Sequence, residues 1–167
     1  MQNILQTLLD TPKAAVSRKT IRMLSVKAVY ERQVIRENAP EYLNTKRFTS
    51  PEQVYEAFCE LQQETREYFI TTHLDGKNRI ICFDRVSVGS LNQCVVHPRE
   101  VFKAAALSSA ASILLLHNHP TADPTPSRED IAITRRLKEA GDLLGILVLD
   151  HIIIGDGYYS FAEHGAL

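Results

Sequence analysis

The apolar residues of this chain recur with a helical period in some segments and with a strand period in others. The first clear helix opens at Ser50-Pro51-Glu52-Gln53, which combines an N-cap serine, a proline at the first helical position and a capping-box glutamine. Its apolar positions follow at helical spacing, at Val54, Ala57, Phe58 and Leu61. Before it we expect a short helix within residues 1–19, a strand at residues 21–30 and a polar linker at residues 37–49.

The rest of the chain alternates between predicted strands and helices. Residues 68–74 are rich in aromatic and β-branched side chains, and the Asp75-Gly76 turn predicts a hairpin back into residues 79–88. The elements expected after the hairpin are a helix from His97-Pro98, a buried strand at 111–116, a helix from Ser127 to near Gly141, and strands at 145–149, 151–154 and 158–161.

This order predicts an α/β fold with a mixed β-sheet flanked by α-helices. The 167 residues suffice for one domain with a substantial core. The net charge of −1 gives no global sign of nucleic acid or of a membrane surface as partner, and no apolar run approaches the length of a membrane span. Three scattered cysteines are typical of reduced thiols, so we expect a cytoplasmic protein.

The most informative pattern is His117-x-His119-Pro120, followed by Ser127 and Asp130. Residues two apart on an extended segment point the same way, so the two imidazoles can bind one ion. Asp130, in the first turn of the following helix, can add a carboxylate oxygen. Three such ligands leave a fourth position for water, as in catalytic zinc sites. Ser127 and Asp130 also have an ordinary explanation as an N-cap and an acidic first-turn residue.

From about Thr49 to Leu167 the chain resembles the RadC-like branch of the JAMM (MPN+) metalloprotease superfamily. The similarity is carried by REYFITTHLDGKNRII, VHPREVFKAAA, HNHPTADPTPSREDIAITRRL and LDHIIIGDGYYSFAEHG. It implies a JAB/MPN fold with a three-layer architecture like that of cytidine deaminases, preceded by a short N-terminal extension at residues 1–48.

The resemblance also implies roles for individual residues. His117, His119 and Asp130 would bind one zinc ion per chain, Ser127 would stabilise the oxyanion, and Glu67 would act as general base. Residue patterns alone leave two rival glutamates. Glu64 continues the glutamate row of its helix, and Glu100 lies in a first helical turn, where the helix dipole explains it. Glu67 opens a strand, where no propensity favours a charge.

Asp150 and His151 are candidates for a supporting role, because metal-bound imidazoles usually donate their second N–H to a carboxylate or a carbonyl. The alternative is that they form a buried hydrogen-bonded pair between strands. On this evidence we expect a zinc-dependent hydrolase that cleaves an amide or isopeptide bond in a peptide or protein.

A second hypothesis is a DNA-associated module of a repair or mobile-element pathway, with a structural or vestigial zinc site. The first 36 residues hold seven Lys and Arg residues against two acidic residues, which suits nucleic acid. A solvated strand edge explains the same excess. The helix-hairpin-helix region of longer RadC-like proteins has no recognisable counterpart here.

Overall fold

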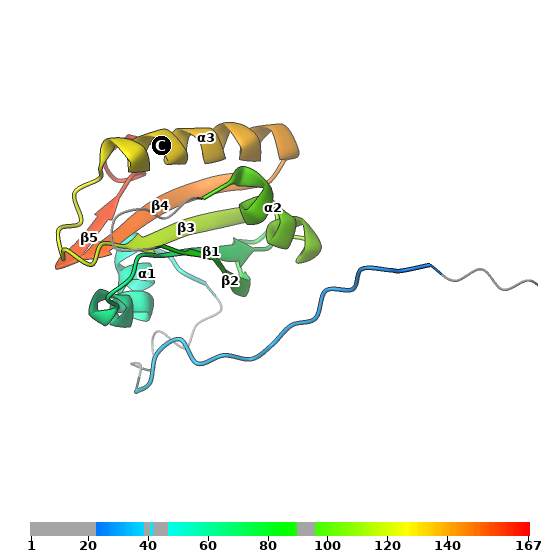
Figure 1. The fold of residues 1–167 in the computed structure, drawn as a ribbon, viewed down its shortest axis with the longest axis horizontal. Coiled ribbons are helices and arrows are strands. Elements are labelled where there is room, and N and C mark those ends of the chain that lie inside the picture. Colours follow the sequence, from blue (N-terminus) through cyan, green and yellow to red (C-terminus); the bar gives the residue numbers. More distant parts are fainter. Residues whose placement is uncertain (1–22, 39–40, 42–46, 90–95) are drawn as a thin grey trace, which may run out of the picture.

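The sheet in the computed structural model, which describes residues 23–38, 41, 47–89 and 96–167, has five strands in the order β2-β1-β3-β4-β5 (Figure 1). Only β3 and β4 run parallel, and the other neighbours pair antiparallel. The predicted mixed sheet is therefore confirmed. The strands are β1 (Tyr68–Leu74), β2 (Ile80–Val88), β3 (Ser112–Asn118), β4 (Leu147–Gly155) and β5 (Gly157–Ser160).

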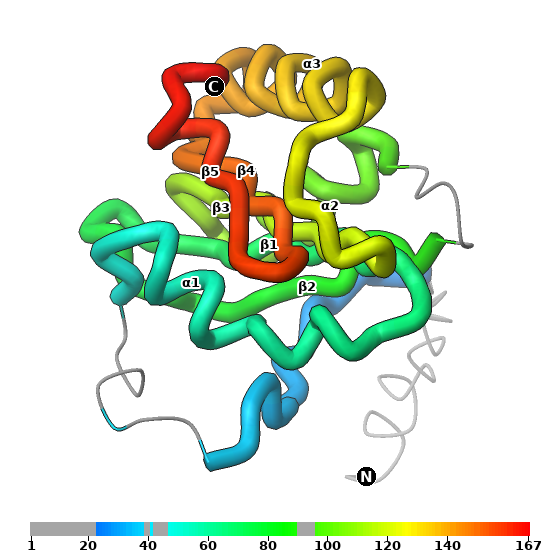
Figure 2. The backbone as a smooth tube through the Cα atoms, turned by 90° about the vertical axis from the view of Figure 1, so that its left-hand side faces the viewer, coloured from blue at the N-terminus to red at the C-terminus, as the bar shows by residue number. Residues whose placement is uncertain are grey.

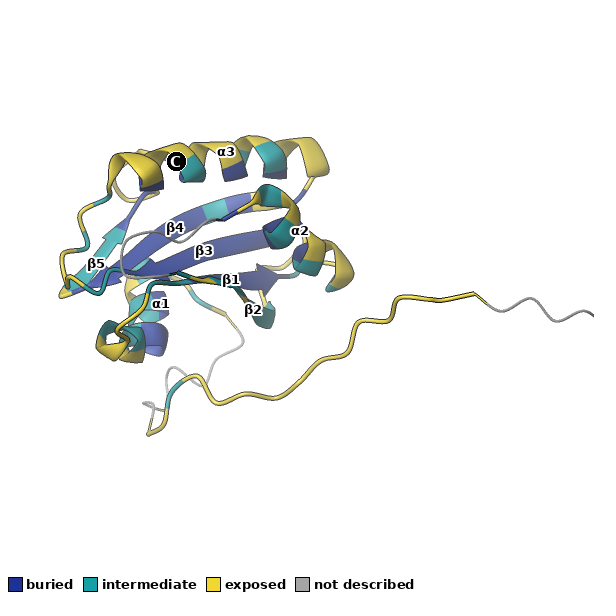
Figure 3. Cartoon of the chain, viewed as in Figure 1, coloured by how far each residue is buried: buried dark blue, intermediate teal, exposed yellow. Residues whose placement is uncertain are grey.

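Helices cover both faces of this sheet, which gives the expected three layers. On one face lie α2 (Pro98–Leu107) and α3 (Arg128–Leu144), and on the other lies α1 (Pro51–Phe58), continued by the 3-10 helix η2 (Cys59–Gln63) (Figures 1 and 2). Two apolar clusters fill the spaces between the layers. Figure 3 shows β3 buried along its whole length between helices whose outer sides are exposed.

The predicted cap of α1 forms with one difference of register. The Ser50 side chain accepts the Gln53 backbone N–H at 3.4 Å, as an N-cap does. The Gln53 side chain, however, accepts the backbone N–H of Thr49 at 3.0 Å instead of that of Ser50. The hairpin also forms as expected, and Asn78 in its turn adopts a left-handed conformation with φ at 55°.

Helix α3 continues past Gly141, where its end was expected, and stops at Leu144. Gly145 supplies the left-handed C-cap, with φ at 71°. Gly141 lies inside the helix because the chain packs closely there: a Cβ atom would lie 2.5 Å from the carbonyl oxygen of Ile146. The interpretation of Gly141 as the end of the helix was therefore wrong, because close packing explains why this position is a glycine.

Strand β4 is continuous, although the sequence suggested two strands separated at Asp150. The register explains the interruption of the pattern. Ile113 pairs with Val148 and Leu114 pairs with Asp150, so Leu149 has no partner on β3. Such an extra residue is a β-bulge, which breaks the alternation of side chains without ending the strand.

The prediction of a strand at residues 21–30 is wrong for residues 23–30, the part that the structure describes, because they form no strand and are exposed. Alternation shows which side chains could share a face, but a strand also needs a partner for its backbone groups. The helix expected within residues 1–19 lies outside the described residues. Among the described helices, none has the length and hydropathy needed to cross a bilayer.

Candidate metal centre

The fold brings three residues together from two layers at one end of β3. The side chain of His117 lies on the same side of β3 as Ile113 and Leu115, which pack under α2 and α3. His119 follows directly after the strand, and its backbone N–H bonds the carbonyl of Ile154 at 2.9 Å. Asp130 comes from the first turn of α3.

The ligand atoms of these three residues lie within 4.8 Å of one another. His117 Nε2 is 3.1 Å from Asp130 Oδ1, and His119 Nε2 is 3.3 Å from Asp130 Oδ2. The two Nε2 atoms are 3.0 Å apart. One side chain atom of each residue therefore points to a common centre.

This donor set fits a zinc ion. With bonds of about 2.0–2.1 Å, the ligand atoms of a tetrahedral zinc site lie about 3.3 Å apart, close to the separations found here. The Nδ1 atom of His119 lies 2.7 Å from the carbonyl oxygen of Asp123 and must donate to it, so Nε2 is the ring atom that is available to a metal ion at the centre. The same separations suit hydrogen bonds, so protons and a metal ion compete for these atoms.

The charges of the site favour an ionised Asp130. Burial opposes ionisation of its carboxyl, but hydrogen bonds from His117, His119 and Ser127 outweigh that effect and hold its pKa well below the ordinary value. Burial lowers the pKa of His119, but hydrogen bonds to Asp130 and to the Asp123 carbonyl raise it overall. The carboxylate of this ligand candidate is thus in the ionised form that a cation requires.

Ser127 caps α3 and also fixes Asp130. Its hydroxyl oxygen accepts the Asp130 backbone N–H at 3.1 Å, and the hydroxyl donates to Asp130 Oδ2 at 2.6 Å. The backbone N–H of Ser127 bonds the same Oδ2 at 2.7 Å, which completes a capping box. The capping interpretation is confirmed, and the single hydroxyl proton of Ser127 is held by Asp130.

Glu67 stands immediately before β1, two residues from Phe69, which pairs with His117. Residues two apart share a side of the strand, so the Glu67 side chain lies on the face of the metal centre. Burial raises the pKa of its carboxyl, while the charge of His117 lowers it and that of Asp130 raises it. The half-buried carboxyl is therefore electrostatically part of this site.

Asn118, the residue between the two histidines, holds the backbone on both sides of Glu67. Its side chain donates to the carbonyl of Arg66 at 2.9 Å and accepts the backbone N–H of Tyr68 at 2.8 Å. The sequence interpretation missed this residue and treated it as a spacer. The available signal was a fully buried asparagine within an otherwise apolar strand, which needs polar partners.

The rival glutamates lie elsewhere. Glu64 follows η2 and is exposed. Glu100 is exposed on α2 and pairs with Lys103 at 2.5 Å and with Arg99 at 3.4 Å. The charges that shift the pKa of Glu67 are those of the histidine–aspartate group, whereas those that shift the pKa of Glu100 belong to Lys103 and Arg99.

The two candidates on β4, Asp150 and His151, have different hydrogen-bond partners. His151 Nε2 lies 2.8 Å from His117 Nδ1, so His151 contacts a metal-ligand candidate directly. The Asp150 carboxylate instead accepts the backbone N–H groups of His151 and Ala162 and the hydroxyl of Ser160, at 2.6–2.9 Å. Asp150 thus anchors the chain after β5, and no hydrogen bond joins it to either histidine of the centre among the described contacts.

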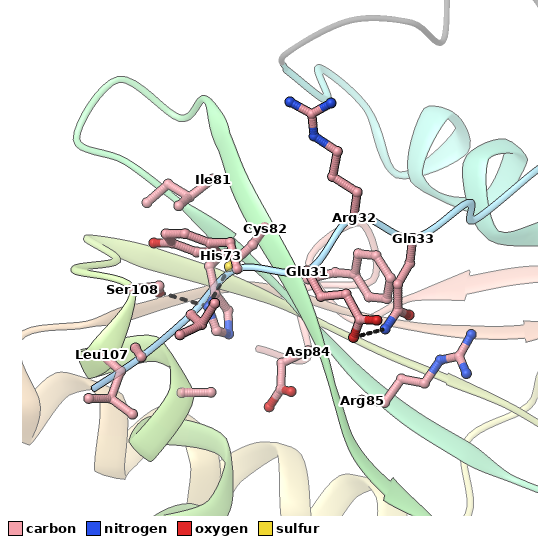
Figure 4. A pocket seen from close by; sticks show the side chains of 15 residues that line it. Glu31, Arg32, Gln33, His73, Ile81, Cys82, Asp84, Arg85, Leu107 and Ser108 are labelled. Atoms are coloured by element: carbon pink, nitrogen blue, oxygen red, sulfur yellow. Dashed lines mark hydrogen bonds between the residues drawn. The ribbon is translucent and has the colours of Figure 1, made fainter. Parts of the chain in front are cut away.

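A separate cavity of about 830 Å³ lies at the opposite end of β1, between β2, α2 and residues 28–33 (Figure 4). The imidazole of His73 contacts Ser108 Oγ at 2.8 Å and Cys82 Sγ at 3.4 Å. Burial lowers the pKa of His73 and raises the pKa of Cys82, so both are favoured in their neutral forms. This cavity contains none of the site residues predicted from the sequence and no activated nucleophile.

Residues 48–166 match the family model of the RadC-like JAB domain. Similar proteins include UPF0758 proteins of Pelobacter propionicus, 66% identical over 74% of this chain, and of Geotalea uraniireducens, 61% identical over 79%. UPF0758 protein GSU0386 of Geobacter sulfurreducens is 53% identical over 89% of the chain. The chain covers 55%, 59% and 66% of these relatives, less than two thirds of their length.

The matched residues include every strand and helix that positions the metal-centre candidates, from α1 to β5. The five-stranded mixed sheet between helical layers agrees with the same fold. On both grounds, this chain belongs to the RadC-like JAB domain family.

Proposed function

We propose that the chain is a JAMM-type zinc metallopeptidase that hydrolyses an amide or isopeptide bond of a peptide or protein. The observation that carries this proposal is the convergence of His117, His119 and Asp130 on one point, beside a half-buried Glu67. A zinc ion bound by these three residues would act as a Lewis acid and lower the pKa of a water molecule toward roughly 7.

Glu67 is the proton carrier in this mechanism. Its raised pKa, caused first by burial, makes the carboxylate a better base than an exposed glutamate. It takes a proton from the attacking water as the oxygen bonds to the substrate carbonyl carbon. It then gives this proton to the leaving nitrogen as the carbon–nitrogen bond breaks, so that one water is consumed for one acid and one amine formed.

Ser127 is the candidate donor to the carbonyl oxygen, which gains negative charge during attack. Ser127 is an exposed residue, and its hydroxyl lies beside Asp130. To serve the substrate, the hydroxyl proton must turn away from Asp130 Oδ2. This turn becomes easier when a cation draws electron density from that carboxylate, because the oxygen is then a weaker acceptor.

The donor set supports a catalytic site over the alternative of a structural or vestigial one. Structural zinc sites are usually closed by four protein ligands, whereas three converge here among the described residues. The partly exposed His119 and the exposed Ser127 also leave the centre open to a substrate. A buried structural site needs neither an opening nor a base beside it.

The test replaces the base and keeps the ligands. Glu67→Gln should retain about one zinc per chain while turnover of a fluorogenic peptide library falls by at least about 10²-fold. Glu64→Gln is the matched control, because it makes the same change three residues away on an exposed side chain. Zinc content and turnover are measured on the same preparations.

Loss of zinc in Glu67→Gln would make Glu67 a ligand and would overturn its assignment as base. Equal turnover in Glu67→Gln and wild type would overturn the hydrolytic mechanism. If wild-type protein binds zinc but cleaves neither the peptide library nor isopeptide-linked substrates, the DNA-associated alternative is favoured. Salt-dependent binding of duplex DNA would then be its own test.

A further inference from the structure

We infer that His151 and Thr134 are positioning residues that fix the tautomer of His117, so that its Nε2 lone pair faces the metal position. This inference deepens the proposed function and rests on it for the identity of the metal centre. Both residues are buried, and Thr134 has no role in the sequence-based interpretation.

Thr134, His151 and His117 are linked by consecutive hydrogen bonds, and the direction of each follows from the first, which ends on a backbone carbonyl. Thr134 Oγ1 lies 2.6 Å from the carbonyl oxygen of Asp130, which can only accept, so the one hydroxyl proton of Thr134 is used there. The same Oγ1 lies 2.5 Å from His151 Nδ1. Since the hydroxyl has no second proton, His151 Nδ1 must carry the hydrogen of this contact.

His151 is held in a setting that favours the neutral imidazole. Its exposed fraction is 0%, and its ring stacks on Phe161 at 5.1 Å and lies 5.5 Å from the ring of Phe69. A charge buried among apolar rings without a counter-charge is unfavourable. A neutral imidazole with its proton on Nδ1 presents a lone pair at Nε2.

The last link fixes His117. His151 Nε2 and His117 Nδ1 are 2.8 Å apart, so a lone pair on the first requires a proton on the second. With Nδ1 as the donor to His151, Nε2 is the atom of His117 that can bind a metal ion, and it faces Asp130 and His119. A metal ion there displaces the proton that Asp130 accepts from Nε2 in the metal-free site. These three contacts, from the Asp130 carbonyl through Thr134 and His151 to His117, form a hydrogen-bond relay. The relay also joins α3 and β3, the two elements that carry Asp130 and His117.

Thr134→Val tests the relay, since it keeps the shape of the side chain and removes its acceptor. His151 would then lose its Nδ1 partner and favour a proton on Nε2, which forces His117 into the opposite tautomer. We expect the zinc Kd, measured by competition with a chromophoric chelator, to rise about 10- to 100-fold. Thr134→Ser keeps the hydroxyl and should restore affinity.

The matched control is Thr72→Val. Thr72 is a buried threonine on the sheet whose hydroxyl has no hydrogen-bond partner in the described structure, so this change removes no relay contact. Zinc affinity should stay at the wild-type level. Thermal unfolding of all variants checks that each is folded under the conditions of the titration.

The tautomers are read directly in metal-free protein by long-range ¹H–¹⁵N correlation of the histidine side chains, assigned with single His→Gln variants. We expect Nδ1 of both His117 and His151 to carry a proton in the wild-type protein, whether or not His117 Nε2 also carries one toward Asp130. A wild-type His117 without a proton on Nδ1 would overturn the inference without any variant. So would a folded Thr134→Val protein with wild-type tautomers and zinc affinity.

Failure of the proposed function gives a different result. If wild-type protein binds no zinc, the metal centre is wrong, yet the tautomer spectrum of the same sample still decides whether the relay exists. If zinc binds and peptides are cleaved while Thr134→Val is unchanged, the proposed function stands and the relay is rejected.

Discussion

Asp130 combines two tasks that are usually carried by different residues. Its Oδ2 atom closes the capping box of α3 with Ser127 and also faces His119, while its Oδ1 atom faces His117. Because the cap fixes the side chain before any ligand binds, the carboxylate is preorganised toward the histidines. The helix start and the metal centre therefore share one set of hydrogen bonds.

Ser127 can be tested so that its capping and catalytic roles separate. Aspartate, normally a good N-cap, would place a second carboxylate against Asp130, so Ser127→Gly is the cleaner change. As an N-cap, glycine costs a few tenths of a kcal/mol, whereas Ser127→Ala costs about 0.5–2 kcal/mol. If the hydroxyl also stabilises the oxyanion, both variants should lose about 10²- to 10³-fold in kcat.

Thermal unfolding and turnover on the same samples check this prediction. The capping role alone predicts that turnover follows stability, with Ser127→Gly close to wild type. Near-wild-type kcat in Ser127→Gly would therefore remove the oxyanion role and leave the cap as the only function of this serine.

At the scale of elements, the connection from β3 to α3 decides where His119 points. The backbone N–H of Asp156 bonds the carbonyl of Ala122 at 2.5 Å, and the carbonyl of Asp123 holds His119 Nδ1. Gly155 permits this approach, because a Cβ atom there would lie 2.4 Å from the Ala122 carbonyl oxygen. The end of β4 thus supports the loop that orients a ligand candidate.

Gly155→Ala should displace residues 122–124 and weaken the bond between Asp123 and His119. We expect lower thermal stability and a zinc Kd raised at least several-fold, because backbone atoms at this distance cannot yield as a flexible side chain does. Gly76→Ala is the control, since a Cβ atom there meets nothing within 4 Å. Equal zinc affinity in both variants would show that the loop does not orient His119.

Elements with a local signal were predictable. Strand β1 was expected at residues 68–74 and is found there, and the caps of α1 and α3 lie at Ser50 and Ser127. Errors occurred where the role of a residue depends on contacts with other elements of the fold. Gly141 faces the carbonyl of Ile146, and the break in the pattern at residue 150 reflects pairing with β3.

The candidate site divides in the same way. The spacing of His117, His119 and Asp130 predicted a group that the fold brings together, because the ligands are close in sequence. Thr134 was not predicted, although it lies four residues after Asp130 on the buried stripe of α3. A polar residue at a core position was the only signal, and its partner His151 belongs to another element.

For the whole molecule, the candidate metal centre connects the sheet with the layer formed by α2 and α3. Two ligand candidates belong to the sheet side and one belongs to α3, so a bound ion would tie that helix to the sheet. An ion that binds the folded protein and not the unfolded chain stabilises the fold by mass action. Metal removal should therefore be visible in global unfolding.

Zinc at about 100 times its Kd should stabilise the wild-type protein by about 2.7 kcal/mol, and a chelator should reverse the shift in Tm. His117→Ala should show no zinc-dependent shift. Zinc must also displace protons, so its affinity should fall as the pH drops through the pKa of His119, which hydrogen bonds to Asp130 and Asp123 raise against the opposing effect of burial. A zinc-dependent shift of equal size in His117→Ala would contradict the site.

Leu149, the residue of β4 without a partner on β3, determines on which face of the sheet the following side chains lie. In an uninterrupted strand, residues an odd number apart lie on opposite faces, so Val148 and His151 would face different layers. With the extra residue, Val148 packs beneath α2 and α3 and His151 also reaches that side, where it meets His117. The orientation of His117, a metal-ligand candidate, therefore depends on one extra residue in a strand that supplies no ligand candidate.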